Sequence, residues 1–311
     1  MVLNKQTFMV DDKPHAVQGF GLKEFEMQYV KDLNPDIWRY NLDHLPDRLE
    51  EVSYLDALEL RRMVSQNIET VFALLFAILQ SSNFVTGWLS LYSMNDLRSL
   101  VKKVSAGESF YNRFSLGSYS WEEIASSLWP NISIDNQNIL VKPLKHMARF
   151  LSSGIDSEEY NALKHGMRLN LGSFAVSFAP SNDPTRKPDE DQFIHMGSAK
   201  FGSSYLKLEK IGNDKLSRQV NKLGTVRRVN WDLKFLLYLA SHTYLTGYNL
   251  VSTLARIWKL EGKPKYVGFS DIKKYEPESD HKYGVSSMSL IQEYDHNSFL
   301  LTKEDVIDSY E

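Results

Sequence analysis

The stretch VFALLFAIL, residues 71–79, is the most apolar segment of the chain and the one that decides its fold. It is about half as long as the ~20 residues that a membrane-spanning helix needs. Polar residues flank it, with Glu69 just before it and QSSN, residues 80–83, directly after it. The stretch therefore predicts the central helix of a soluble bundle, beginning near Tyr54 and buried on nearly all sides.

The composition of the 311-residue chain is that of a folded globular protein, with 42% hydrophobic and 24% charged residues. The 36 basic and 39 acidic residues give a formal charge of -3, which excludes a chain-wide polycation that binds nucleic acid non-specifically. Because the chain has no cysteine, disulfides, zinc–thiolate sites and cysteine nucleophiles are excluded. The N-terminal sequence lacks an apolar core followed by a small-residue cleavage site, which predicts a cytoplasmic protein with no membrane association.

Helical periodicity extends beyond the central segment. Apolar residues recur at three- and four-residue steps over residues 94–104, and Gly107 is placed to end that helix. Ser120 can cap the short helix that follows it. Residues 139–150 also have a helical period, with Pro143 either in the first turn or marking a break.

After residue 170 the period changes from about 3.6 to about 2. SFAVSFA, residues 173–179, and YLKLEKI, residues 205–211, alternate in the manner of strands. Between them, residues 181–192 hold two prolines and no aliphatic side chain, which predicts an exposed loop. The helical period returns over residues 231–260 and predicts a second long, buried helix.

These patterns predict an α+β fold that is mainly α, with an N-terminal helical bundle over residues 1–170, a small antiparallel β element and a long C-terminal core helix. Residues 171–311 contain the β element, the long helix and a tail. They are expected either as a separate unit or folded into the same domain as the bundle.

Charge is unevenly distributed along the chain. Residues 24–59 contain ten acidic and three basic residues, a net charge of -7, whereas residues 200–234 contain nine basic and three acidic residues, a net charge of +6. The basic segment is either an ordinary solvated surface that pairs loosely with the acidic one, or a phosphate-binding surface. In the second case Arg227 and Arg228 are the candidate substrate-binding residues.

The common catalytic signatures are absent from the sequence. There is no GxxxxGK(S/T) loop, no GxGxxG after a strand, no HExxH and no GxSxG. No two of the eight histidines stand four residues apart, the spacing with which one helix holds a metal ion. We therefore expect no cofactor and no metal site. His242, within LYLASHTYL, is predicted to be a hydrogen-bonded histidine of the core.

The segment DSEEYNALKHGMR, residues 156–168, is the most informative for function. Asp156 and Glu159 have the spacing of a capping box, which predicts that a helix begins here. In that helix Tyr160 and Leu163 fall on an apolar stripe, which would seat it on a core.

A second flank of the same helix is polar. At 100° per residue, Asn161, His165 and Arg168 fall together there. An amide, an imidazole and a guanidinium side by side can bind a phosphate, and an imidazole with an unperturbed pKa of ~6.5 can transfer protons near neutral pH. The alternative is a surface helix whose histidine and arginine only meet solvent.

The core of this segment, YNALKH, resembles the active-site motif of the HEPN superfamily of small helical bundles, many of which carry an Arg-Asn pair followed by a His. The resemblance implies a metal-independent ribonuclease, a dimer whose paired helices form one cleft, and a place in a toxin–antitoxin or antiviral defence system. Asn161 and His165 match the family's Asn and His, whereas Tyr160 stands in place of its arginine. Arg168 can supply the missing cation from beyond the motif.

Two functions follow from these observations. The first is an RNA-acting, HEPN-like ribonuclease in which His165 is the general acid or base, Arg168 and Lys164 bind the phosphate, and Asn161 orients the scissile group. The second is a non-catalytic binding or assembly protein that acts as a partner subunit, and Tyr160 favours it. The expected partner is RNA in the first case, and a protein or a second copy of the chain, as a dimer, in the second.

Overall fold

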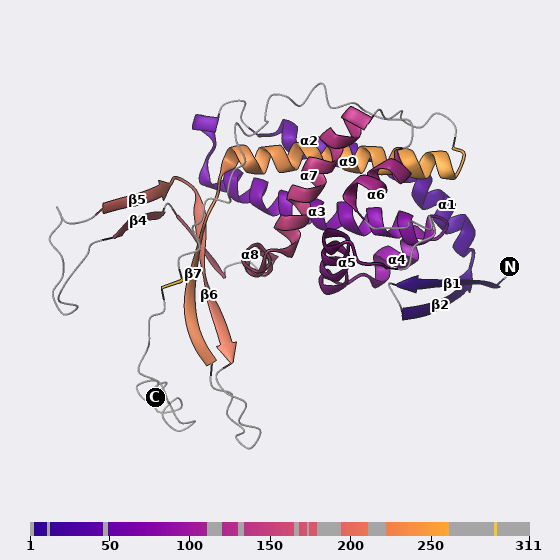
Figure 1. Cartoon of the computed structure of the whole chain (residues 1–311), viewed down its shortest axis with the longest axis horizontal. Helices are drawn as coiled ribbons and strands as arrows, with labels where there is room; N and C mark the ends of the chain where they lie inside the picture. Colours follow the sequence, from indigo (N-terminus) through magenta and orange to yellow (C-terminus); the bar gives the residue numbers. More distant parts are fainter. Residues whose placement is uncertain are drawn as a thin grey trace, which may run out of the picture.

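The computed structural model describes residues 3–10, 13–45, 49–110, 120–129, 134–164, 168–172, 174–178, 194–210, 222–260 and 289–290. In this part of the chain, a helical body carries the hairpin β1–β2 at one end and a sheet at the other (Figure 1). The helices are α1 (Leu22–Asp32), α2 (Asp36–Asp43), η1 (Leu49–Glu51), α3 (Tyr54–Ser81), α4 (Val85–Leu91), α5 (Met94–Ala106), α6 (Trp121–Leu128), α7 (Ile134–Ser152), α8 (Gly154–Lys164) and α9 (Leu233–Ile257). The strands are β1 (Leu3–Val10), β2 (Lys13–Phe20), β3 (Leu169–Leu171), β4 (Phe174–Phe178), β5 (Ile194–Ala199), β6 (Gly202–Lys210), β7 (Lys222–Asn230) and β8 (Ser289–Leu290). The predicted class, α+β and mainly α, is confirmed.

Two long helices, α3 and α9, form the centre of the body. α3 begins with a capping box in which Ser53 Oγ accepts from the Asp56 N–H at 3.2 Å and Asp56 Oδ2 accepts from the Ser53 N–H at 3.0 Å. At the start of α9, the Asp232 carboxylate accepts from the backbone N–H groups of Lys234 and Phe235. The two helices lie side by side, and their apolar side chains belong to one hydrophobic core (Figure 1).

The predicted central helix is confirmed. Of residues 71–79 all but Ala73 are buried, and the helix begins at Tyr54 as expected. Among the described helices, α3 alone has the length and hydropathy to cross a membrane, and 78% of its most apolar window is buried inside the protein. Its apolar surface is therefore largely covered by the rest of the chain.

The predicted ends of two shorter helices are also confirmed. α5 begins with a capping box between Ser93 and Asp96 and ends at Gly107, whose φ of 69° is in the left-handed region that favours glycine. α6 begins at Ser120, which exchanges backbone and side-chain hydrogen bonds with Glu123. Both helices thus follow from local chemistry.

α7 is longer than predicted, and Pro143 lies in its interior instead of in a first turn or at a break. An interior proline removes one backbone donor and crowds the preceding turn, at a cost of ~3 kcal/mol. The helix continues because its apolar face packs against α5, α6 and α9. The residues of that face are Leu140, Val141, Leu144 and Met147.

The sequence patterns did not predict the hairpin β1–β2. Its connection, residues 11–12, is Asp-Asp and lacks the glycine of the common two-residue turns. The buried side chains Phe8 and Val10 attach the hairpin to the body, with the Phe8 ring 5.0 Å from that of Trp88 in α4. Tertiary contacts therefore compensate for a weak turn signal.

The main sheet is antiparallel in the order β3–β6–β7–β8, and β4 and β5 form a separate hairpin. The predicted strands over 173–179 and 205–211 correspond to β4 and β6, and the helix predicted over 231–260 is α9. The predicted loop over 181–192 lies outside the described residues. Helix α8 contacts α3 and α7 on one side and β3 and β6 on the other, so it connects the body to the sheet.

Candidate functional site

Helix α8 carries the predicted site, but it does not begin as predicted. The Asp156 N–H donates to Ser153 Oγ at 3.3 Å, so Ser153 caps the helix, and Asp156 already lies in its first turn. The predicted capping box between Asp156 and Glu159 is therefore wrong. Both carboxylates bind the guanidinium of Arg61 on α3 instead.

Two members of the predicted catalytic trio, Asn161 and Arg168, do not lie on the same helix. Asn161 is exposed on α8, whereas α8 ends at Lys164 and Arg168 lies beyond it, exposed, one residue before β3. Arg168 instead directly precedes β3, which pairs with β6. His165 lies outside the described residues.

Lys164, which was predicted to bind phosphate, forms an ion pair with Glu69. Lys164 Nζ lies 3.0 Å from Glu69 Oε2 and 4.3 Å from the centre of the Tyr160 ring. Tyr160 is buried, and burial, followed by the neighbouring Glu69 carboxylate to which it hydrogen bonds, raises its pKa far above the ordinary range. The phenol therefore stays protonated, and with Lys164 and Glu69 it attaches α8 to α3.

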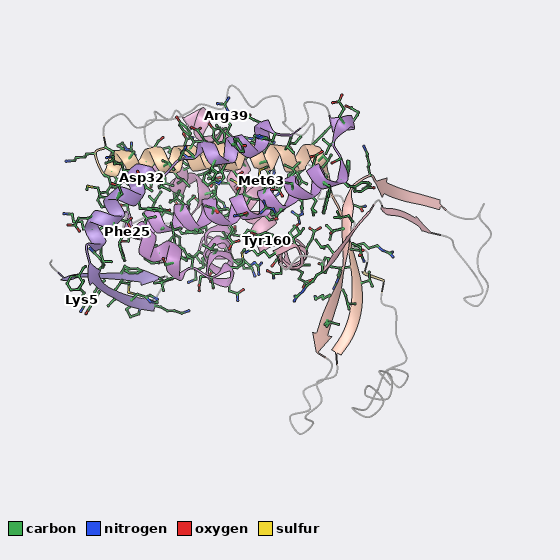
Figure 2. All side chains as sticks on the ribbon, turned by 180° about the vertical axis from the view of Figure 1, so that it is seen from behind. Lys5, Phe25, Asp32, Arg39, Met63 and Tyr160 are labelled. Carbon is green, nitrogen blue, oxygen red and sulfur yellow. The ribbon has the colours of Figure 1, made fainter. Side chains whose placement is uncertain are left out.

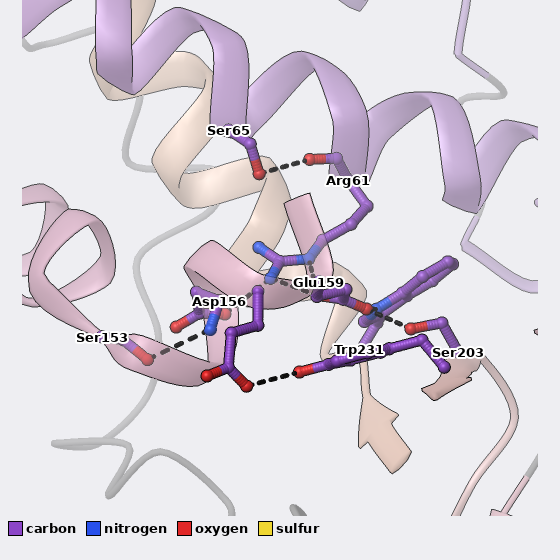
Figure 3. Close-up of polar contacts among 9 residues, drawn as sticks. Arg61, Ser65, Ser153, Asp156, Glu159, Ser203 and Trp231 are labelled. Carbon is purple, nitrogen blue, oxygen red and sulfur yellow. Dashed lines mark hydrogen bonds and ion pairs between the residues drawn. The ribbon is translucent and has the colours of Figure 1, made fainter. Parts of the chain in front are cut away.

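A buried polar network lies beneath this helix (Figure 3). Arg61 Nε donates to Glu159 Oε2 at 2.8 Å, and Nη2 donates both to Glu159 and to Asp156 Oδ1, the latter at 2.6 Å. The second oxygen of Glu159 accepts from Trp231 Nε1 at 2.7 Å and from Ser203 Oγ. Although burial opposes the charged form of Arg61, the two carboxylates hold its pKa above the ordinary value.

This network is structural, because Arg61 is 1% exposed and Glu159 is fully buried, out of reach of a substrate. It joins α3 and α8 to β6 and to Trp231, which lies between β7 and α9. Sequence reasoning missed it, although a signal was available. Arg61 stands between Leu60 and Val64 on the apolar face of α3, where a charged side chain needs a buried partner.

One face of β6 and β7 exposes aliphatic side chains to solvent. Leu206 is 58% exposed and Leu208 is 55% exposed. Leu206 pairs with Val226 and Leu208 with Gly224, and a Cβ added to Gly224 would lie 3.3 Å from Leu206 Cδ1. We call the surface of β6 and β7 on this side the leucine face; its residues are Ser204, Leu206, Leu208, Gly224, Val226 and Arg228.

The structure separates the two predicted substrate-binding arginines. Arg228 pairs with Ser204 on the leucine face, whereas Arg227 pairs with Tyr205 on the opposite side, since neighbouring residues of a strand alternate between faces. On that opposite side, Lys207 Nζ lies 2.8 Å from Glu158 Oε1. Arg168 lies at the edge of the sheet, one residue before the one that pairs with Tyr205.

Within the described residues, no group of three histidine, aspartate or glutamate side chains is placed to hold a metal ion. No protein-family model, no curated protein and no solved structure matches the chain. The HEPN resemblance of residues 160–165 therefore stays a prediction.

Proposed function

We propose that this protein is a non-catalytic binding protein that contacts a partner protein through the leucine face. The observation that carries the proposal is the exposure of Leu206 and Leu208, each by more than half, on one side of β6. Single exposed apolar residues are ordinary, but adjacent ones on a projecting strand are typical of a surface that another molecule covers. Figure 1 shows β6 and β7 extending away from the helical body.

The side chains of this face suit a protein better than RNA. Sheets that bind single-stranded RNA stack bases on exposed aromatic rings. The leucine face presents leucine and valine, which gain from burial against another apolar surface, and Arg228, which can bind carboxylates bidentately. We therefore expect a partner with an apolar surface bordered by aspartate or glutamate.

The surroundings of α8 support a binding role over catalysis. Glu69 neutralises Lys164, and Arg168 does not share the helix of Asn161. Of the predicted phosphate-binding cations, Lys164 is thus paired with a carboxylate, and Arg168 is not held beside Asn161 by a shared helix.

Site-specific crosslinking tests the proposal. A photoreactive benzoylphenylalanine replaces Leu206, and the control carries it at Leu55, which is 71% exposed on α3. We expect an adduct with one protein from position 206 and not from position 55. That protein is identified by mass spectrometry, and its complex with the purified chain is then reconstituted.

In the reconstituted complex, Leu206→Asp/Leu208→Asp is expected to raise Kd by about tenfold or more, a loss of about 1.4 kcal/mol, and Leu55→Asp to leave it unchanged. Circular dichroism confirms that the variants are folded. No protein adduct from position 206, or an adduct with RNA, would overturn the proposal.

A second candidate function is the RNA-acting one, and the exposure of Asn161 and Arg168 favours it. Its test is incubation of the purified protein with total RNA in EDTA. Cleavage that disappears in His165→Ala would establish a ribonuclease and contradict the non-catalytic proposal. A cytoplasmic role in a toxin–antitoxin or antiviral defence system belongs to this candidate.

A further inference from the structure

A cleft lies between the end of α1 and the start of α2, and its chemistry complements that of the leucine face. The carboxylates of Asp32 and Asp36 line it together with the side chains of Ile37 and Tyr40. Ile37 and Tyr40 are each 63% exposed. Tyr29, Leu33 and Asn34 complete the lining, and we call this surface the acidic cleft.

The two surfaces also carry charges of opposite sign. Asp32 and Asp36 line the acidic cleft, whereas Arg228 belongs to the leucine face. Both surfaces thus expose apolar side chains that can cover each other, and their charges are of opposite sign.

One copy of the chain cannot bring these surfaces together. Asp32 and Phe25 lie at the end of the helical body away from the sheet, as Figure 2 shows. The sheet itself is held at the other end by the bonds of Glu159 to Arg61, Ser203 and Trp231. A leucine face can therefore reach the acidic cleft only from another copy of the chain.

We propose that the leucine face of one copy docks in the acidic cleft of a second copy. This inference rests on the proposed function and names its partner. Leu206 and Leu208 meet Ile37 and Tyr40, and Arg228 meets Asp32 and Asp36. Asp32 accepts from Gln28 Nε2 at 2.7 Å and Asp36 from the Tyr244 hydroxyl at 3.4 Å, and each carboxylate has further acceptor positions.

The contact is head-to-tail, because it joins two different surfaces. In an open dimer each copy uses one surface and presents the other, so association continues into larger species or closes into a ring. Because attraction between exposed opposite charges contributes to this contact, sodium chloride is expected to weaken the association of the two copies.

A mixing experiment tests this geometry with two variants at exposed positions. The cleft variant is Asp32→Lys/Ile37→Lys, and the face variant is Leu206→Asp/Leu208→Asp. By sedimentation velocity, the wild type is expected to form dimers and larger species with rising concentration, and each variant alone to stay monomeric. An equimolar mixture is expected to form a 1:1 dimer and nothing larger, because one intact face then meets one intact cleft. Leu55→Asp is the matched control and should associate as the wild type does.

Three outcomes would overturn the inference: a monomeric wild type, oligomers that persist in both variants, and a dimer that is lost in the face variant but kept in the cleft variant. Crosslinking from position 206 separates this failure from that of the proposed function. An adduct with a different protein, together with a monomeric wild type, would contradict the docking of two copies but support the proposed function. The absence of any protein adduct would contradict both proposals.

Discussion

Arg61 and Glu159 show how a single buried pair can place one part of the molecule on another. Taking two charges out of water costs several kcal/mol per ion, so further bonds to both groups are needed to offset that cost. Here Asp156 binds the same guanidinium, and Ser203 and Trp231 donate to the same carboxylate, while Nη1 of Arg61 is buried without a hydrogen-bond partner among the described residues. Glu159 is therefore a central link between the helical body and the sheet, beside the ion pair of Glu158 with Lys207.

Replacing Arg61 with alanine is expected to lower the free energy of unfolding by about 3–5 kcal/mol, because the Glu159 carboxylate then stays buried without its cation. The adjacent Arg62 pairs with Glu59 at the surface, where both side chains are about half exposed. Arg62→Ala is thus a matched control, with an expected loss of about 0–1 kcal/mol. Urea denaturation measures both, and equal losses would contradict the assigned role of the buried pair.

A second single residue, His242, is expected to make the stability of the fold depend on pH. Its side chain is buried on α9, as predicted, 4.4 Å from the Tyr238 ring between centroids. Burial, and then the nearby His146, lower its pKa to about 3. In the unfolded chain the pKa is ~6.5, so below that pH the unfolded state binds a proton that the folded state does not. Stability is therefore expected to fall as the pH drops from about 6.5 toward 3, by up to ~1.4 kcal/mol per pH unit.

The variant His242→Gln should flatten this part of the stability profile. His44 is exposed, so His44→Gln is the control that keeps the wild-type slope. The measurement is the free energy of unfolding in urea at several values between about pH 4 and pH 6. An unchanged slope in His242→Gln would show that another group is responsible.

At the scale of elements, the docking of α2 on α9 depends on a glycine. A Cβ built on Gly247, in the interior of α9, would lie 1.5 Å from Cζ3 of Trp38 on α2. Glycine in a helix interior costs about 1 kcal/mol relative to alanine. The indole that packs in the vacant Cβ position compensates for this cost and sets the position of α2.

Gly247→Ala is therefore expected to destabilise the protein by about 1–3 kcal/mol despite the better helix propensity, since the Trp38 ring must move. Gly154→Ala is the control, because no heavy atom lies within 4 Å of the Cβ that it adds at the start of α8. Denaturation followed by tryptophan fluorescence compares the two. A stabilised Gly247→Ala would mean that the indole moves at little cost.

For the whole molecule, the core combines segments from distant parts of the sequence. α3 and α9 lie nearly 180 residues apart by their first residues, Tyr54 and Leu233, and yet share one hydrophobic cluster. A fragment of residues 1–170 keeps α3 but loses the helix that covers one of its sides. Such a fragment is expected to lose cooperative thermal unfolding, followed by circular dichroism, whereas the full chain keeps it. A sharp transition in the fragment would show that residues 1–170 fold as a domain of their own.

How far the sequence predicts this protein depends on whether the signal is local. The central helix over residues 71–79 and the caps at Ser93 and Ser120 could be predicted, because periodicity and capping involve residues within a few positions of each other. The prediction that Pro143 lies in a first turn or at a break was wrong, because the packing of α7 against α5, α6 and α9 outweighs the local cost of the proline.

The candidate site was less predictable for the same reason. The alternation in YLKLEKI separates Leu206 and Leu208 from Tyr205 and Lys207, but it does not say which side is covered. The capping spacing of Asp156 and Glu159 gives no sign of Arg61, which lies about 95 residues earlier.

The sequence alone therefore determined the long helices α3 and α9, the helices α5 and α6 with their caps, the strands β4 and β6, and how charge divides between residues 24–59 and 200–234. The tertiary structure decided that Glu159 is a buried partner of Arg61, that Lys164 is bound to Glu69, and that the leucines of β6 face solvent. The reason is physical: a periodic pattern marks the apolar side of an element, but what covers that side depends on residues that only folding brings near.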